Sequence, residues 1–167
     1  MTPEVIDIVI PWVDGDDPIL AAKRRQYLTG KREDKHADVA AATSFCDLGE
    51  LFWCIDSINI FAPFIRKIFI VTDGQAPQLE EHLRARFPEG NIPVEIVDHS
   101  VIFKGDEKNR PTFNSRSIEA LIWRIPGLSE HFVLMNDDFF LAGPVKPEDF
   151  YQGEKTVCYA DWRWTWL

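Results

Sequence analysis

Four short segments rich in β-branched residues recur along the chain, and segments with helical periodicity separate them. They are residues 5–10, 67–72, 94–97 and 132–135. Their apolar residues are nearly continuous instead of alternating with polar ones, which is typical of strands covered on both faces. Because strand and helix patterns alternate, the sequence predicts an α/β fold with a mostly parallel sheet flanked by helices.

The predicted helices lie between these strands, and each has one apolar face. The helix at residues 47–62 opens with Asp47 and Glu50, spaced as a capping box, and ends before Pro63. The other helices are predicted at residues 19–28, 79–87 and 114–125. Two segments fit neither pattern, and we expect both to be mobile loops: residues 30–42, interpreted as a lid or a solvated insertion, and residues 105–110.

Charge and composition exclude several classes of function. Eighteen Lys and Arg against 27 Asp and Glu give a net charge of −9, and a pI near 4.9 disfavours nucleic acid as a partner. An anionic ligand would therefore need a metal ion between it and the protein. No apolar run is long enough for a transmembrane segment, and no secretory signal begins the sequence. Three cysteines without CxxC spacing are interpreted as reduced and as binding no zinc: Cys46, Cys54 and Cys158.

Acidic residues follow each of the predicted strands. In chain order they are Asp14, Asp73, Asp98 and the adjacent pair Asp137 and Asp138. Because parallel strands end at the same edge of a sheet, we expect these carboxylates to share one crevice there. Gathered carboxylates repel one another unless a cation neutralises them, and oxygen ligands favour Mg²⁺ or Mn²⁺.

Each acidic motif also has a purely structural interpretation. Turn chemistry is the stronger interpretation of Asp73 and Gly74 taken alone. Three consecutive Asn and Asp residues at positions 136–138, between a buried strand and apolar residues, exceed what a turn needs, so a function is favoured there. The acidic residues of segment 12–18 are explained equally well as a cap for the next helix.

Three weaker candidates remain. His99 is interpreted as a structural histidine ahead of a general base. Arg116 and Asn114 lie at the start of a predicted helix, where backbone donors and a cation could hold a phosphate, although capping explains Asn114 equally well. Three tryptophans alternate near the end of the chain, and core packing is favoured over a platform for sugar: Trp162, Trp164 and Trp166.

Several stretches match known signature motifs. Residues 6–18, which include the run Trp12, Val13, Asp14 and Gly15, resemble the first signature region of the Stealth proteins. The second region is matched in pieces at residues 50–58, 62–77, 111–119, 124–132 and 136–140. Stealth proteins are nucleotide-sugar hexose-1-phosphate transferases of bacterial capsule synthesis, and the lysosomal-enzyme N-acetylglucosamine phosphotransferase of animals belongs to the same family.

The resemblance implies one GT-A-like catalytic domain over residues 1–167. It implies transfer of a sugar 1-phosphate from a nucleotide diphosphate sugar, with UDP-sugar favoured, to a hydroxyl of a polysaccharide or sugar acceptor. The implied nucleotide-sugar contacts are Trp12, Val13, Asp14 and Gly15. Asp73 and Asn114 are added to these contacts from their places after a strand and at a helix start. The implied metal and catalytic centre is Asn136, Asp137 and Asp138, with Mg²⁺ or Mn²⁺ on the two aspartates. Arg116 is added as a catalytic candidate from its place at the helix start, where it could steady the transferred phosphate. We expect a cytoplasmic protein, and leave open a peripheral position at the inner membrane and a homo-oligomer.

The chain also departs from the family pattern. Pro11 stands where members generally have Thr, and Arg116 and Ser117 replace Asn and Ala. The family's third and fourth signature regions have no counterpart before Leu167. We therefore expect part of a longer enzyme, a site completed by a second chain, or an inactive chain. Two other functions stay open: a metal-dependent glycosyltransferase that releases nucleoside diphosphate, and a non-catalytic nucleotide-sugar-binding module.

Overall fold

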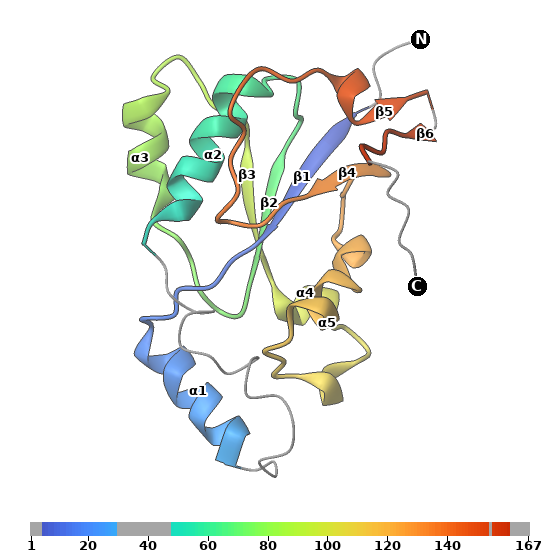
Figure 1. Ribbon diagram of the computed structural model, residues 1–167. Coiled ribbons are helices and arrows are strands. Elements are labelled where there is room, and N and C mark those ends of the chain that lie inside the picture. The colour runs from blue at the N-terminus through green and yellow to red at the C-terminus, as the bar shows by residue number, and fades with distance from the viewer. Residues whose placement is uncertain (1–4, 30–47, 154, 161–167) are drawn as a thin grey trace, which may run out of the picture.

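Four parallel strands form one sheet in the order β3-β2-β1-β4, and helices cover both of its faces (Figure 1). The structure is a computed structural model, and it describes residues 5–29, 48–153 and 155–160. The strands of the sheet are β1 (Ile6–Pro11), β2 (Ile68–Thr72), β3 (Val94–Asp98) and β4 (His131–Leu134). The predicted α/β class with a parallel sheet is confirmed, and the arrangement is consistent with a GT-A-like fold.

The helices and a small hairpin complete the fold. The α-helices are α1 (Pro18–Thr29), α2 (Glu50–Phe61), α3 (Leu79–Arg86), α4 (His99–Ile102) and α5 (Ser115–Glu119). Short 3₁₀ helices lie at Glu107–Asn109, Ile122–Arg124 and Pro147–Asp149. An antiparallel hairpin follows β4 and pairs β5 (Tyr151–Gln152) with β6 (Lys155–Thr156).

The sheet separates two hydrophobic cores, because successive side chains of a strand point to opposite faces. On β1, Ile8 and Ile10 pack into the core that contains α2 and α3, whereas Val9 packs into the core that contains α4 and Ile122. Both faces of β1 and β2 are therefore covered, as their apolar patterns predict. The outer strands β3 and β4 are less covered, and Ile96 and Leu134 are exposed.

The start of α2 differs from the prediction. The helix begins at Glu50 with Gly49 as its N-cap, at φ 88°, and no side chain caps it. The Glu50 carboxylate instead accepts a hydrogen bond from the Leu48 N–H at 2.6 Å. The predicted capping box is therefore wrong, because a glycine in the left-handed region starts the helix three residues late. Asp47 itself lies outside the described residues.

The predicted helix at residues 114–125 is two short pieces. α5 ends at Glu119, and the chain continues as a 3₁₀ turn whose hydrogen bonds join residues three apart. A 3₁₀ turn aligns side chains at a spacing of three, and this places Ile122 and Ile125 together in the core. Pro126 disfavours a helical conformation at Ile125, which is extended.

An ion pair between Arg66 and the buried Asp7, at the edge of the sheet where the parallel strands begin, was not predicted. Asp7 is fully buried in β1, and its carboxylate accepts hydrogen bonds from the Arg66 guanidinium and, at 2.7 Å, from the Ser129 N–H. Arg66 also donates to the Gly127 carbonyl at 2.7 Å. The hydrogen bond with Asp7 raises the pKa of Arg66. Asp7 therefore fastens the start of β1 to the segments that precede β2 and β4.

The predictions for loops, cysteines and tryptophans have different outcomes, because some of these residues lie outside the described ones. Residues 105–110, predicted to be a loop, contain one 3₁₀ turn. Residues 30–42, Cys46 and the three tryptophans at positions 162, 164 and 166 lie outside the described residues. Among the described residues, Cys54 is a buried and Cys158 an exposed free cysteine. Within the described part of the chain, no helix has the length and apolar character needed to cross a bilayer.

Candidate active site

The four parallel strands bring the predicted site residues to one edge of the sheet. The ladder continues past the strands, since the Trp12 N–H donates to the Val71 carbonyl at 2.9 Å and the Met135 N–H donates to the Val9 carbonyl at 3.0 Å. Along this edge the order is β3, β2, β1 and β4. The segment after β1 therefore lies between the Asp73 turn after β2 and residues 136–138 after β4, called the acidic loop below.

The acids after β2 and β3 already have cationic partners. Lys23 of α1 forms an ion pair with Asp73, and Arg110 reaches the same carboxylate at 3.3 Å. Arg110 also lies 3.6 Å from Asp98. The Asp73 side chain is only 9% exposed. These four residues and His99 form a network, called the β2–β3 cluster below, in which two carboxylates meet two cations.

Asp98 and His99 are held inside this cluster by the local backbone. Burial alone would raise the pKa of Asp98, but hydrogen bonds from Ser100 and from the Gly74 N–H, together with the Arg110 charge, lower it. The Asp98 carboxylate also caps α4. Burial lowers the pKa of His99 against the opposing effect of Asp73 and Asp98. A buried, neutral ring packed near Phe103 supports the structural interpretation of this histidine.

The loop after β1 is fixed by an amide from the β2 turn. Gln75 accepts a hydrogen bond from the Asp14 N–H at 3.0 Å and donates to the Asp14 carbonyl and the Asp17 carboxylate, both at 2.9 Å. The hydrogen bond from Gln75 is the main reason why the pKa of Asp17 is lowered. Asp17 also accepts from the Ile19 N–H at 2.8 Å, so the capping interpretation holds for Asp17. Asp14 is placed by Gln75 instead.

The acidic loop is held from beneath by α2. The Cys54 Sγ atom lies 3.8 Å from the Asn136 carbonyl, and the Ser57 hydroxyl accepts a hydrogen bond from the Leu141 N–H at 2.9 Å. A 3.1 Å hydrogen bond from the Phe139 N–H to the Asn136 carbonyl closes the turn. One turn of α2 thus contacts the backbone at both ends of the segment that carries Asp137 and Asp138.

The Cys54 thiol reports the electrostatic field of the acidic loop. Burial, and to a smaller extent the negative charges of Asp137 and Asp138, raise its pKa to about 12. Asp138 is exposed and Asp137 is half-buried. The loop therefore presents negative charge to solvent beside a thiol that stays protonated.

The donor set of this loop suits a metal ion that is shared with a substrate. Among the described residues, no group of three or more His, Cys, Asp and Glu side chains could hold a metal ion. Mg²⁺ is commonly bound by one or two carboxylates and completes its shell with water and substrate phosphates. Two adjacent carboxylates at positions 137 and 138 fit this mode, and they do not form a centre made of protein ligands alone.

The start of α5 is organised by its own cap. The Asn114 side chain accepts a hydrogen bond from the Arg116 N–H at 3.0 Å, which is the capping interpretation. The Arg116 side chain is exposed. A role of either residue in holding phosphate or nucleotide sugar stays a prediction, as it does for Trp12, Val13 and Gly15.

Several residues that shape this edge escaped the sequence analysis. Lys23 and Arg110 carry no distinguishing motif, because they are two of 18 basic residues and their partner is far away in the sequence. Ser57 and Cys54 lie on an apolar helical stripe, which indicates core packing. Gln75 is the one with a usable signal, since a polar residue directly after an Asp-Gly turn is placed to reach a neighbouring loop.

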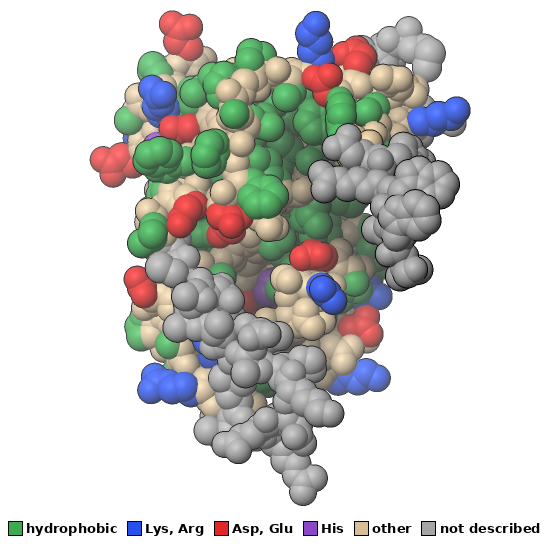
Figure 2. Space-filling view, in the orientation of Figure 1, with side chains coloured by type: hydrophobic (Ala, Val, Ile, Leu, Met, Phe, Trp, Pro, Cys, Tyr) green, Lys and Arg blue, Asp and Glu red, His purple; other side chains and the backbone are tan. Residues whose placement is uncertain are grey.

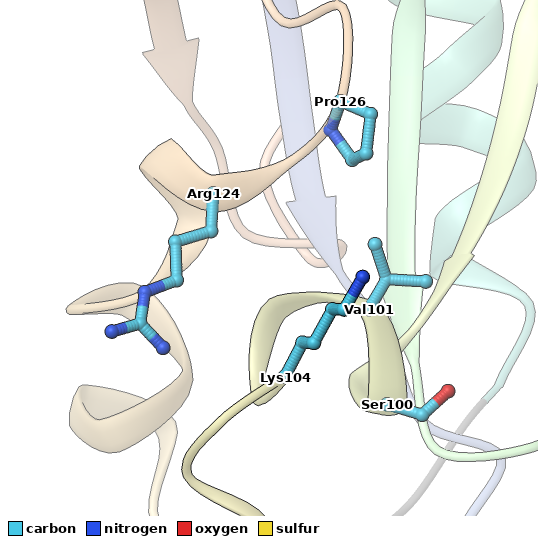
Figure 3. Close-up of a pocket in the computed structure, with 5 residues that line it drawn as sticks. All are labelled: Ser100, Val101, Lys104, Arg124 and Pro126. Carbon is cyan, nitrogen blue, oxygen red and sulfur yellow. The ribbon is translucent and has the colours of Figure 1, made fainter.

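Two of the cavities on the described surface lie on opposite sides of the sheet. One, of about 500 Å³, is lined by Trp53, Asp56 and Ile60 of α2, by α3 and by the segment after the acidic loop. Figure 2 shows hydrophobic side chains gathered over this part of the molecule. The other, also about 500 Å³, lies beside α4 (Figure 3). There the Arg124 guanidinium points away from Pro126 and donates to the Asp106 carboxylate at 2.6 Å.

Two family models match the chain across this site. Stealth protein conserved region 1 matches residues 4–32, which include the loop after β1. Stealth protein conserved region 2 matches residues 44–159, which include α2 and the acidic loop. The chain belongs to the Stealth protein family. The family suggested by the motifs is thereby confirmed.

Named relatives support the same assignment. The chain is 40% identical over 146 residues to an exopolysaccharide phosphotransferase of Streptomyces coelicolor. It is 36% identical over 147 residues to a capsular polysaccharide phosphotransferase of Actinobacillus pleuropneumoniae, and 37% identical over 146 residues to a receptor polysaccharide phosphotransferase of Streptococcus oralis. These matches cover 87% to 88% of this chain, and 23%, 38% and 41% of the three relatives, respectively.

Proposed function

We propose that this Stealth chain binds a nucleotide diphosphate sugar with Mg²⁺ or Mn²⁺ and transfers the sugar 1-phosphate to a hydroxyl of a saccharide acceptor. The observation that carries the proposal is the acidic loop, which α2 holds at the carboxyl edge of a parallel sheet. Nucleotide ligands bind at this edge in open α/β sheets. The relatives named as polysaccharide phosphotransferases support a saccharide acceptor.

The proposed reaction is an in-line displacement at phosphorus. The acceptor oxygen forms a bond to the phosphorus that carries the sugar, while the bond from this phosphorus to the bridging pyrophosphate oxygen breaks. The nucleoside monophosphate leaves, and the acceptor hydroxyl loses its proton to a base. Such a reaction needs positioning and neutralisation of the charge on the phosphate oxygens more than covalent chemistry by the protein.

Asp137 and Asp138 would hold the divalent ion. The contacts of Cys54 and Ser57 with the backbone of Asn136 and Leu141, called the α2 clamp below, would keep their backbone fixed. When bound, the ion supplies positive charge against the phosphate oxygens. Cys54 stays a neutral thiol beneath the loop because its pKa is about 12. The negative charge at this place therefore comes from the two carboxylates and not from the thiol.

The loop after β1 would hold the nucleotide. Gln75 forms hydrogen bonds with both the N–H and the carbonyl of Asp14, which prepares the loop before a ligand binds. The Trp12 ring is largely buried in the α2 core, so Trp12 would shape the pocket from beneath while Val13 and Gly15 border it. Arg116 would steady the transferred phosphate, since its side chain is exposed and cationic.

The proposed function is tested by the identity of the nucleotide product. The 167-residue chain is incubated with a panel of UDP-sugars, MgCl₂ and oligosaccharides, and the nucleotides are separated by ion-exchange chromatography. We expect uridine monophosphate to form and EDTA to stop its formation. Release of uridine diphosphate would instead indicate glycosyl transfer. Binding of UDP-sugar without any product would indicate a binding module.

A further inference from the structure

The cavity beside α2 has an aromatic and aliphatic floor. Trp53 is 72% exposed, Phe140 is 63% exposed and Ile60 is 47% exposed, and all three line it. Large apolar side chains with this exposure are individually common, but here they gather around one concave site. In Figure 2 the hydrophobic area on this part of the surface has acidic side chains at its lower border.

One wall of the cavity is polar and held in place. The Asp56 carboxylate interacts with His82 Nε2 at 2.8 Å and with Arg86 Nε at 3.4 Å, and all three side chains line the cavity. His82 also makes an edge-type ring contact with Phe52, at a centroid distance of 4.9 Å. The cavity therefore offers fixed donors and acceptors next to an exposed indole.

This mixture of groups matches the two kinds of surface on a sugar. Pyranose rings present apolar C–H faces that stack on aromatic rings and hydroxyl groups that hydrogen-bond to charged side chains. A small number of placed polar groups on an apolar cavity is also the general pattern of a ligand site. An apolar helix from a partner would remove water from the Asp56–Arg86 pair without supplying hydrogen bonds in its place, at a cost in free energy.

The cavity is lined in part by the segment that follows the acidic loop. Phe140 lies two residues after Asp138, and the Leu141 N–H of the same segment donates to Ser57, which also lines the cavity. The helix that carries Trp53 also carries Cys54, which contacts the acidic loop. A molecule on Trp53 and Phe140 would therefore contact the segment that directly follows the acidic loop.

We propose that this cavity is the acceptor subsite, which binds a neutral saccharide by stacking on Trp53 and by hydrogen bonds to the Asp56–Arg86 wall. The proposal rests on the proposed function, because that function supplies the saccharide acceptor. The subsite holds the acceptor chain next to Asp138, so that one hydroxyl faces the phosphate bound there. The donor binds on the other side of the acidic loop, at the loop after β1.

Binding of saccharides in the absence of donor tests this subsite separately from catalysis. The 167-residue chain is applied to an array of neutral oligosaccharides of glucose, galactose, N-acetylglucosamine and N-acetylgalactosamine, and affinities for bound members are measured by calorimetry. We expect W53S and F140S each to weaken binding about tenfold or more, because truncating an aromatic anchor at a binding site has effects of this size.

Trp123 offers a matched control. It is 64% exposed and lies in the 3₁₀ helix Ile122–Arg124, on the other side of the sheet from α2. W123S is expected to leave saccharide affinity within about twofold of the wild type. Circular dichroism of each variant establishes that the fold is intact, and R86Q, which replaces an exposed side chain, provides a second test if W53S does not fold.

Three results would overturn the subsite. The first is that no array member binds, and the second is that W53S, F140S and R86Q bind as tightly as the wild type. The third is that the wild type is a dimer by sedimentation and W53S is a monomer, which would make this face an interface between two copies. The proposed function fails differently, since it would be contradicted by the absence of nucleotide monophosphate even when saccharides bind.

Discussion

The acidic loop and the β2–β3 cluster arise from the same sequence pattern, an aspartate directly after a strand, and have opposite electrostatic environments. In the β2–β3 cluster, Asp73 pairs with Lys23 and Arg110, and its side chain is nearly buried. In the acidic loop, Asp138 is exposed and Asp137 is half-buried, and their negative charges contribute to the raised pKa of the Cys54 thiol. Position at the carboxyl edge alone therefore does not make an acid a ligand.

The difference lies in what the neighbouring elements contribute. α1 and the segment before Pro111 bring cations to the β2–β3 cluster, which ties these segments to the sheet. α2 contributes a thiol and a hydroxyl to the acidic loop, and these contact backbone atoms. The first arrangement pairs carboxylates with cations, whereas the second fixes the backbone that carries Asp137 and Asp138.

The largest effect is expected from neutralising the acidic loop. D137N should lower formation of nucleotide monophosphate about 1,000-fold or more, because it removes a ligand of the ion that neutralises the phosphates. Initial rates with saturating UDP-sugar and MgCl₂ measure this change. The melting temperature should stay the same, and a variant with unchanged rate would remove Asp137 from the site.

The next effect separates the two regions by stability. D73A should lower the free energy of unfolding by about 2 kcal/mol, because it leaves two partly buried cations without their carboxylate. D138A should change it by less than about 0.5 kcal/mol, as is usual for an exposed side chain. Urea denaturation followed by circular dichroism measures both. Equal losses in the two variants would contradict the contrast between the regions.

A smaller effect is expected at the clamp beneath the acidic loop. S57A leaves the Leu141 N–H without its hydrogen bond and should lower the free energy of unfolding by about 1 kcal/mol. It should also raise the Mg²⁺ concentration needed for half-maximal rate, whereas S57T, which keeps the hydroxyl, should restore it. A stability loss without any change in the Mg²⁺ dependence would make Ser57 purely structural.

The smallest effect is a pH dependence from the β2–β3 cluster. Because burial lowers the pKa of His99 below its ordinary value of 6.5, the unfolded chain binds the proton more readily than the folded chain. The contribution of the neutral His99 ring to the free energy of unfolding is therefore complete above pH 6.5. It is lost as the pH falls through the lower pKa of the folded protein. H99Q should therefore lose less stability than the wild type between about pH 7 and about pH 5, measured by urea denaturation. An equal loss in both proteins would contradict this.

The sequence was informative where a pattern repeats locally. Four nearly continuous apolar segments are enough to predict the parallel sheet, and topology then places their acids at one edge. Local patterns failed where a single backbone feature overrides them, as with Gly49 at the start of α2 and Pro126 after the predicted last helix. Residues 136–138 were singled out because three consecutive Asn and Asp residues exceed the needs of a turn.

The pairing of charges could not be predicted, because it depends on contacts between distant residues. Lys23 and Asp73 are separated by 50 positions, and Arg66 and Asp7 by 59. Any of the basic residues could have been the partner on the basis of sequence alone. Of the acids at this edge, Asp73 and Asp98 have cations of the protein as partners, whereas a metal ion at Asp137 and Asp138 stays a prediction.

Calorimetric titration of UDP and MgCl₂ into three proteins tests this division most directly. The wild type and D98N should bind with affinities within about threefold of each other, because Asp98 belongs to the region that the protein neutralises itself. D138N should bind at least about tenfold more weakly, because it removes a carboxylate from the metal site. Weak binding by D98N together with wild-type affinity in D138N would contradict the account.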